Sequence, residues 1–497
     1  MVDHCQEVPQ NSDLHHASEV WAAMLTGIRR LCHMRSESDP VPVTEPQRSR
    51  RRGDGMSSSS DLRAARRAGL GSFIGTAIEW YDFFIFGTAA ALVFGEVFFP
   101  TASPAAGLLA SFATFWTGFL ARPLGGVLFG HLGDRIGRKK TLVTTLVLMG
   151  VSSTAIGLVP SYASIGMAAP ALLILLRLVQ GLALGGEWGG AVLIAAEHAP
   201  PSRRILFGAF AQQGSPAGGL LATLVFLGVS RLPAEDFAAW GWRVPFLVSA
   251  VLLVVGLVIR LTVAESPEFL AAKRRGEIVK APAAEVLRTA PAAVLLGIGA
   301  SAIGIGAAYF LNAFMIAWTT TELGVTRETI LSALLVGTII QFCAQPVAAL
   351  IAHRVGATRF MIVALVASAL LTPVCYLLVS TGDGSKIVLG IILINIVAPA
   401  YFAVLAGFLT HAFPARIRYT GISLAYQLSA TVIGGSVPLI AQSLLSSGGI
   451  GLVVAYHVGL IILTLACVAA LGRRTAKSQK VADLPDNSDL RASDAHA

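Results

Sequence analysis

Charged residues are scarce in this chain, and their scarcity argues against a soluble fold. Asp, Glu, Lys and Arg make up 13% of the 497 residues, whereas hydrophobic residues make up 55%. An ordinary soluble domain has about 25% charged residues. The apolar runs are long and unbroken, unlike the alternating segments of about ten residues that build membrane β-barrels. The composition therefore predicts an all-α membrane protein, because each span must satisfy its own backbone hydrogen bonds.

Patterns that support catalysis or bind metals are missing as well. The chain has five cysteines and no Cys-x-x-Cys pair, so we predict neither a disulfide framework nor a metal site. The sequence shows no nucleophile–base pair and no phosphate-cradling loop, and we interpret His457 as a packed membrane histidine. We therefore predict that the protein is not an enzyme and has no cofactor. Its net charge of +9 lies in loops and tails, which favours a role in membrane topology over nucleic-acid binding.

Long apolar segments follow one another from residue 70 onward. Each approaches or exceeds the roughly 20 residues that a membrane-spanning helix needs. We expect twelve spans, at 70–94, 105–129, 141–160, 170–195, 205–229, 243–264, 291–318, 328–351, 360–380, 386–410, 418–443 and 450–472. They predict five regions: a disordered cytoplasmic tail (1–68), a six-helix half (69–264), a cytoplasmic link (265–290), a second six-helix half (291–472) and a cytoplasmic tail (473–497). Met56, followed by four serines, is a candidate natural start, with residues 1–55 as an extension.

Basic residues are distributed unequally between the two sets of predicted loops. The tails, the central link and the loops on their side hold most of the Lys and Arg near the membrane. The opposite side holds only Arg231, Arg243, Arg327 and Lys386. Because cytoplasmic loops carry the excess of Lys and Arg, we expect both termini in the cytoplasm and an even number of spans.

A short repeat relates the two halves. Four residue types recur 213 positions apart, at the loops before the fifth and eleventh helices: His198 and His411, Pro201 and Pro414, Arg203 and Arg416, Gly208 and Gly421. Halves related by repetition are typical of secondary transporters, in which the solute binds near the midplane between them. The repeat therefore predicts a central solute site.

Ionisable residues within the spans are the strongest functional signal, because each costs at least about 2.5–3.5 kcal/mol to insert. The candidates for proton coupling and solute binding lie on the first, second and fourth helices: Glu79, Asp82, Arg122, Arg177, Gln180 and Glu187. Glu79 and Asp82 are about 60° apart on a helix, so we expect them to share a side. The alternative is a set of fixed salt bridges that lock helix packing.

The proposed chemistry follows from the environment of a buried carboxylate. Burial favours its protonated form, and a neighbouring cation favours its charged form. A solute anion that competes for the cation would switch this balance and couple solute binding to protonation.

Polar but uncharged residues dominate the spans of the second half. Possible solute contacts are Asn312, Gln341, Tyr426 and Gln427. Buried amides in membranes also bridge helices, so Asn312 and Gln341 keep both interpretations. We interpret Tyr309 as a packing or interfacial residue.

The loop between the second and third helices predicts a cytoplasmic gate. Its residues combine glycines, one acid and several bases: Gly130, Asp134, Arg135, Gly137, Arg138 and Lys139. The acid can pair with the arginines or lie at a helix N-terminus, where a negative charge is favourable. Such a cluster can hold the cytoplasmic helix ends together and release them; the alternative is a plain basic loop.

These motifs together resemble the major facilitator superfamily, and within it the metabolite:proton symporter family. The loop resembles the superfamily signature G-x-x-x-D-R-x-G-R-K. The narrower resemblance rests on stretches 79–83, 122–126, 177–190, 241–246 and 265–269 and covers about residues 68–475. In the corresponding loop of the second half, His353 stands where an acid is expected, which predicts a weaker gate there.

The resemblance implies proton-driven uptake of a small anionic or zwitterionic metabolite across a bacterial cytoplasmic membrane. The scaffold can function as a monomer. Osmosensing is not expected, because the tail after residue 473 is short and has no apolar heptads. Two alternatives stay open: an efflux carrier of the same superfamily, and a non-transporting membrane sensor. Arg122 and Arg177 favour anionic solutes over cationic drugs.

Overall fold

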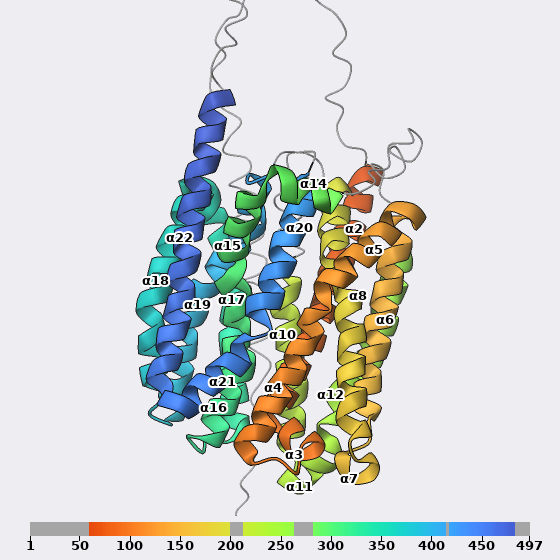
Figure 1. Cartoon of the computed structure of the whole chain (residues 1–497), viewed down its shortest axis with the longest axis vertical. Coiled ribbons are helices and arrows are strands. Elements are labelled where there is room, and N and C mark those ends of the chain that lie inside the picture. Colours follow the sequence, from red (N-terminus) through yellow and green to blue (C-terminus); the bar gives the residue numbers. More distant parts are fainter. Residues whose placement is uncertain (1–58, 199–211, 263–281, 414–416, 483–497) are drawn as a thin grey trace, which may run out of the picture. The chain divides into compact units, whose positions relative to one another are not determined.

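The protein was analysed as a computed structural model that describes residues 59–198, 212–262, 282–413 and 417–482. These residues belong to one compact unit, Ser57–Ala497. Every regular element in the described ranges is a helix. Most are long, run roughly parallel to one another and form a bundle (Figure 1).

The first half of the bundle contains six spans, several of them interrupted. In chain order its helices are α2 (Ser59–Leu92), α3 (Phe94–Phe98), α4 (Pro104–Leu120), α5 (Arg122–Ile136), α6 (Arg138–Leu158), α7 (Tyr162–Ile165), α8 (Ala168–His198), α10 (Gly214–Ser230), α11 (Ala234–Asp236), the π-helix η2 (Phe237–Gly241) and α12 (Arg243–Thr262). The second span joins α4 to α5 at a break before Pro123, because proline cannot supply a helical N–H.

The second half repeats this plan after the short link helix α14 (Pro282–Thr289). Its helices are α15 (Pro291–Tyr309), η3 (Phe310–Met315), α16 (Ile316–Thr321), α17 (Arg327–Val355), α18 (Ala357–Val379), α19 (Gly384–Thr410), α20 (Arg418–Ser429), η4 (Ala430–Gly434), α21 (Val437–Gly448) and α22 (Ile450–Ala482). Two spans therefore contain π-helical turns, which often lie at functional sites.

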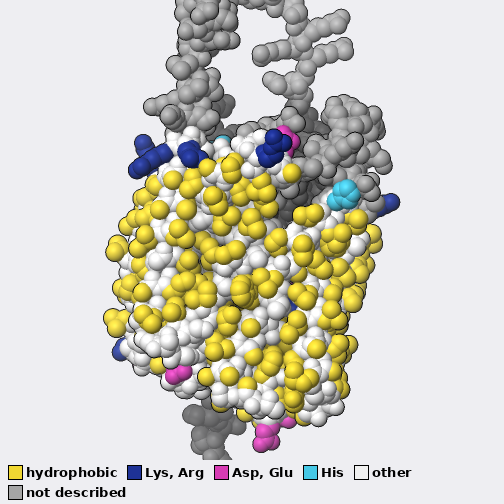
Figure 2. Space-filling view, viewed as in Figure 1, with side chains coloured by type: hydrophobic (Ala, Val, Ile, Leu, Met, Phe, Trp, Pro, Cys, Tyr) yellow, Lys and Arg dark blue, Asp and Glu magenta, His cyan; other side chains and the backbone are white. Residues whose placement is uncertain are grey.

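The prediction of twelve membrane-spanning helices in two halves is confirmed. Within the described residues, ten helical segments are long and apolar enough to cross a membrane. The other two spans are α10, which is apolar but has 17 described residues, and α2, which has Glu79 and Asp82 in its length. Hydrophobic side chains cover the visible flank of the bundle, and charged side chains gather at its two ends (Figure 2). The chain is a multi-pass membrane protein.

Some helix limits differ from the expected spans. Helix α2 begins at Ser59, inside the predicted tail, and α22 continues to Ala482, beyond the predicted end of the last span. Residues 1–58, 263–281 and 483–497 lie outside the described ranges. The predicted limits of the tails and link therefore stay predictions.

Capping residues set several helix ends. The Ser103 hydroxyl accepts the Ala106 N–H at the start of α4, and the Thr326 hydroxyl accepts the Thr329 N–H at the start of α17. Asp383 caps α19 in the same way. A hydrogen bond from the Ser385 hydroxyl lowers the pKa of Asp383 below its usual value, helped by the Lys386 N–H.

The two halves share a turn that only glycine adopts easily. Gly137, between α5 and α6, has φ 104°, and Gly356, between α17 and α18, has φ 91°. The two glycines occupy the same connection in each half, between its second and third spans. The sequence repeat itself falls largely outside the described ranges.

Close glycine packing brings the second and fourth spans together. A Cβ added at Gly181 of α8 would lie 1.9 Å from the Gly118 carbonyl oxygen, and one at Gly185 would lie 2.0 Å from that of Arg122. Helix backbones can approach this closely only where side chains are absent. The contact places Arg122 beside α8 in the interior.

Candidate functional site

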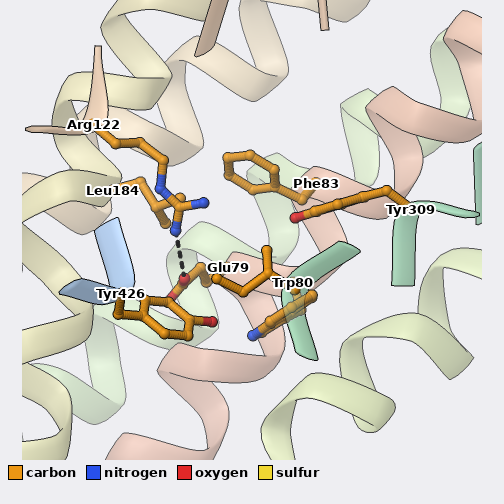
Figure 3. Close-up of a pocket in the computed structure, with 8 residues that line it drawn as sticks. Glu79, Trp80, Phe83, Arg122, Leu184, Tyr309 and Tyr426 are labelled. Atoms are coloured by element: carbon orange, nitrogen blue, oxygen red, sulfur yellow. Dashed lines mark ion pairs between the residues drawn. The ribbon is translucent and has the colours of Figure 1, made fainter. Parts of the chain in front are cut away.

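A small cavity lies inside the bundle, between the two halves. The space between its lining atoms is about 220 Å³, including the part that is open to solvent. Its lining comes from five helices of the two halves: Glu79, Trp80 and Phe83 of α2, Arg122 of α5, Leu184 of α8, Ile305 and Tyr309 of α15, and Tyr426 of α20 (Figure 3). The site therefore has charged groups from the first half and phenol groups from the second.

Glu79 and Arg122 form an ion pair in this cavity. The Arg122 Nη2 and Glu79 Oε1 atoms are 3.9 Å apart, and both side chains are at most 5% exposed. Figure 3 shows the two groups facing each other, with Tyr426 beside Glu79. A tight charge-assisted hydrogen bond is about 2.7–2.9 Å long. The pair is thus an electrostatic contact between buried groups, and its spacing leaves N–H groups of Arg122 able to donate to another oxygen.

Aromatic rings form the walls around this pair. The rings of Trp80 and Tyr309 are nearly parallel, with centroids 6.4 Å apart. The Arg122 guanidinium lies 5.3 Å from the Phe83 ring centroid and 5.1 Å from that of Phe119. Cation–π contacts of this type stabilise a desolvated cation without neutralising it. Arg122 therefore stays available to an anionic ligand.

Asp82 lies outside the cavity lining, although we expected it on the same side as Glu79. It is fully buried, and its Oδ1 accepts a hydrogen bond of 2.7 Å from the Ser249 hydroxyl of α12. Helix α2 packs against α8, α10 and α12. Two residues that lie about 60° apart around α2 can therefore face different neighbouring helices.

Arg177 also lies outside the cavity lining, in a cage of phenylalanine rings. Its guanidinium carbon is 4.4 Å from the Phe83 ring centroid, 4.2 Å from that of Phe86 and 5.0 Å from that of Phe115. It donates to the Phe115 carbonyl and to the Gln180 side chain. This arrangement fits the structural interpretation.

Gln180 extends the Arg177 network to the third span. Its Nε2 donates to the Ser153 hydroxyl of α6 at 2.7 Å. The chain of hydrogen bonds links α8 to α4 and α6 within the first half. Glu187, the last candidate on this helix, has a side chain outside the described set.

The second-half candidates divide into cavity and packing residues. Tyr426 lines the cavity. Gln427, next to it, reaches the Gly185 carbonyl of α8 at 3.4 Å and so bridges the halves. Asn312 donates to the Ala308 carbonyl of its own helix, and Gln341 does not line the cavity.

The predicted gate loop spans the junction of α5 and α6. Asp134 and Arg135 lie in the last turn of α5, Gly137 forms the turn, and Arg138 begins α6. The Lys139 Nζ donates to the Leu261 carbonyl at the end of α12, at 2.7 Å. Basic groups favour such helix C-termini. Side-chain positions at Gly130, Asp134, Arg135 and Arg138 fall outside the description.

Sequence reasoning missed several residues that line the cavity. Trp80, Phe83, Leu184 and Ile305 gave no signal apart from their apolar character. We had interpreted Tyr309 as a packing residue, but it lies in the cavity at the junction of α15 and the π-helix η3. A broken helical period around Phe310 is the signal that could have indicated it.

Comparison with known proteins assigns the family. Residues 70–293 match the family model described as "Sugar (and other) transporter". The chain is 40% identical over 408 residues to the inner membrane metabolite transport protein YhjE of Escherichia coli K12, covering 80% of this chain and 91% of that protein. It is 41% identical to the shikimate transporter of the same organism, covering 78% and 89%. It is 32% identical to the proline/betaine transporter of Salmonella typhimurium, covering 86% and 87%.

Solved structures agree on the fold. The crystal structure of a D-xylose-proton symporter superposes with a TM-score of 0.67 at 18% identity, covering 81% of this chain and 97% of that one. At this identity the match speaks for the fold alone. Together with the relatives above, it shows that the chain belongs to the major facilitator superfamily and is one of its membrane transporters of metabolites.

Proposed function

We propose that this protein is a proton-coupled symporter that takes up a small organic acid or zwitterionic metabolite by alternating access. The observation that carries the proposal is the Glu79–Arg122 pair in a cavity between the halves. A buried pair whose two members both face a cavity can exchange partners when a charged solute enters.

The exchange couples solute to proton as follows. The carboxylate of the solute contacts the Arg122 guanidinium and separates it from Glu79. Glu79 then lies in a low-dielectric site without its cation, where the protonated form is favoured. A proton from the outer solution binds to a Glu79 oxygen, and both ligands travel together. Release of the proton on the inner side restores the ion pair and expels the solute.

Tyr309 and Tyr426 would complete solute recognition from the second half. Each supplies a hydroxyl that can donate to a solute oxygen, and both line the cavity together with the charged pair. If the two tyrosines close on the bound solute, the halves would change between the outward-open and inward-open forms only when the site is filled. Trp80 and Phe83 would then pack against the apolar body of the solute.

Asp82 is the second candidate for the coupled proton. It is close enough to Arg177 for the two charges to interact, so in our proposal its charge balances the caged arginine. Glu187 and the gate residues Gly130, Asp134, Arg135, Gly137, Arg138 and Lys139 keep their proposed roles as a further ionisable group and a cytoplasmic gate.

The solute class follows from charge and from the cavity lining. Among the described lining residues Arg122 is the cation, and most of the others are apolar or aromatic. A cationic Arg122 favours a carboxylate. Relatives described as shikimate and proline/betaine transporters support a carboxylate with a neutral or zwitterionic body. We further propose a monomer in the bacterial cytoplasmic membrane with both termini inside.

The proposal is tested by a proton-coupled uptake screen in cells that express the full chain. The solutes are shikimate, dicarboxylates, tricarboxylates and betaines. Symport predicts that one class accumulates, that its addition makes the medium more alkaline, and that a protonophore abolishes accumulation. Accumulation that survives the protonophore would contradict proton coupling. Solute-dependent acidification of the medium would instead indicate efflux by exchange.

A further inference from the structure

The second and eleventh spans are joined by two hydrogen bonds that cross between the halves. The Trp116 Nε1 of α4 donates to the Thr431 carbonyl of η4 at 2.8 Å. The Thr431 hydroxyl donates back to the Phe119 carbonyl at 2.8 Å. We call these two bonds the clasp. Its three residues belong to neither the predicted site nor the predicted gate.

Each carbonyl oxygen in the clasp lacks the hydrogen bond that it would accept, in a regular α-helix, from the N–H four residues later. A local defect of the helix removes this bond in both cases. In a regular helix the N–H of residue 123 would donate to the Phe119 carbonyl, but Pro123 has no N–H. Likewise, the Gly435 N–H would donate to the Thr431 carbonyl, but in the π-helix it donates to Ala430 at 3.0 Å instead. An exposed carbonyl in a low-dielectric interior costs free energy unless a donor reaches it. The clasp supplies a donor to each defect from the opposite half.

The clasp lies next to the cavity, on its outer side. Along the second span, Trp116 and Phe119 precede the cavity residue Arg122 by one to two turns. Along the eleventh span, Thr431 follows the cavity residue Tyr426 by five positions. In Figure 1 the helices continue from the clasp toward the end of the bundle that carries α3, α11 and α16, opposite the link helix α14. With the proposed topology, that end faces outward.

Gly435 allows the aromatic part of the clasp to close. A Cβ at this position would lie 2.6 Å from the Phe119 ring and 2.7 Å from the Trp116 ring. Both rings therefore pack directly on the backbone of the eleventh span. Together with the hydrogen bonds, this contact joins the second and eleventh spans on the outer side of the cavity residues Arg122 and Tyr426.

The Thr431 hydroxyl has a second acceptor, which makes the clasp reversible. Its oxygen also lies 2.9 Å from the Gln427 carbonyl of its own helix. A hydroxyl has one proton, so it can donate to Phe119 while the halves are together and to Gln427 when they part. The Thr431 hydroxyl therefore has an acceptor in both arrangements. The indole N–H of Trp116 would donate to water when the outer side opens.

From this geometry we propose that Trp116 and Thr431 are positioning residues that hold the outer side of the cavity closed and fix Arg122 and Tyr426 at their working distance. The proposal rests on the transport cycle proposed above, but only on its alternating access and its sidedness. Substitution of either residue should shift the unliganded protein toward the outward-open form. Loss of one intramolecular hydrogen bond predicts a shift of roughly 2- to 10-fold in the ratio of open to closed populations.

The test measures the distance between the outer ends of the two spans. Spin labels are attached at Ala102→Cys and Ser447→Cys, both exposed, in the full chain with its five native cysteines replaced by serine. Distance distributions are recorded in lipid nanodiscs without solute. Thr431→Val and Trp116→Phe should each enlarge the long-distance population by the stated factor, and Thr431→Ser should restore the wild-type distribution. Gly435→Ala should also enlarge the long-distance population, because the added methyl group would clash with the Phe119 and Trp116 rings. The donors and acceptors of both clasp hydrogen bonds are kept in this variant.

Two matched control variants distinguish loss of the clasp from a general effect of removing a buried polar group. Thr372→Val removes a buried hydroxyl that bonds only within its own helix, to Ser368. Trp242→Phe removes an indole N–H that donates to the nearby Ala238 carbonyl. Both should leave the distances unchanged. Equal distributions for Thr431→Val, Gly435→Ala and these controls would overturn the proposal.

The outcome is independent of proton coupling. If the uptake screen finds no proton-dependent transport, the distance measurement still decides whether the clasp exists. If uptake is proton-driven but the distances do not respond, the clasp is refuted and the proposed function stands. In transport assays the clasp variants should lower kcat while KM for the solute changes less, and Thr431→Ser should rescue kcat.

Discussion

The two halves of the molecule bury different kinds of polar side chain. In the described residues of the first half, five charged side chains of the spans are buried: Glu79, Asp82, Arg122, Arg177 and, in the last turn of α12, Arg260. In the described spans of the second half, the buried polar groups are hydroxyls, amides and the imidazole of His457. The contrast teaches that the two halves differ in the kind of polar group they bury, and the cavity brings both kinds together.

Even within the first half, the two arginines differ. Arg122 faces the cavity and a carboxylate, whereas Arg177 is enclosed by rings and bonded to its neighbours. In our proposal the same residue type thus binds the solute in one span and serves as a packing element in another. Side-chain identity alone does not distinguish the two uses.

Substitution of Arg122 should have the largest effect. Arg122→Gln removes the only cavity cation among the described lining residues and with it the ion pair to Glu79. Removing one member of a buried charge pair costs about 2–5 kcal/mol, which corresponds to roughly 30- to 4,000-fold in kcat/KM. Uptake of the carboxylate solute measures the effect. Arg231→Gln, at an exposed pair with Glu328, is the matched control and should keep normal uptake; full uptake in Arg122→Gln would exclude its role.

Substitution of the carboxylates separates the two candidates for the proton. Glu79→Gln and Asp82→Asn each keep the shape of the side chain and remove its titration. We expect Glu79→Gln to lose accumulation above the external concentration while solute exchange continues, because exchange needs no net proton movement. Asp82→Asn should do the same only if Asp82 carries the proton. Counterflow and accumulation assays on vesicles distinguish these results, and pH-sensitive accumulation in both variants would contradict the scheme.

A third prediction concerns the caged arginine. Arg177→Met should lower the unfolding temperature, because Phe115 and Gln180 lose a buried donor, at about 1–3 kcal/mol for each unsatisfied group. The KM for solute should change less than tenfold. Arg122→Met should change the KM for the solute strongly, and it should also lower the unfolding temperature because it removes the cation beside the buried Glu79 carboxylate. An equal change in KM in the two variants would remove the distinction between the arginines.

The smallest effects should come from the phenols of the second half. Tyr309→Phe and Tyr426→Phe each remove one hydroxyl from the cavity, which should raise KM roughly 2- to 10-fold for the loss of one hydrogen bond. Tyr376→Phe is the control, because this hydroxyl lies 3.2 Å from His457 Nδ1 outside the cavity lining. An unchanged KM in both cavity variants would confine solute recognition to the first half.

The sequence was sufficient for the architecture and for part of the site. Apolar segment lengths predicted the twelve spans, and the cost of buried charge pointed to Glu79 and Arg122, which the structure brings together. These signals are local, because the length of an apolar segment and the cost of a buried charge are properties of a single membrane-spanning helix. The interruption of the second span at Pro123 was also readable from the chain.

The remaining features depend on which neighbour each side chain meets. Asp82 and Glu79 differ by less than one helical turn, yet one meets Ser249 and the other Arg122. Tyr309 enters the cavity where η3 changes the helical period, and Thr431 reaches Phe119 across 312 residues of sequence. Hydrophobic patterning carries no information about such long-range contacts, because it indicates which face of a helix is buried but not which neighbour that face meets.

The ion pair at the centre has a consequence for how the membrane potential acts on the carrier. With Glu79 ionised and Arg122 cationic, the empty site carries no net charge. When a monocarboxylate and one proton occupy it, the added charges also cancel. A cycle of this kind is electroneutral, so the roughly 2.3 kcal/mol available per charge per 100 mV would not drive it, and the pH gradient alone would. A zwitterion carried with the same proton would move one positive charge inward, and its uptake would respond to voltage.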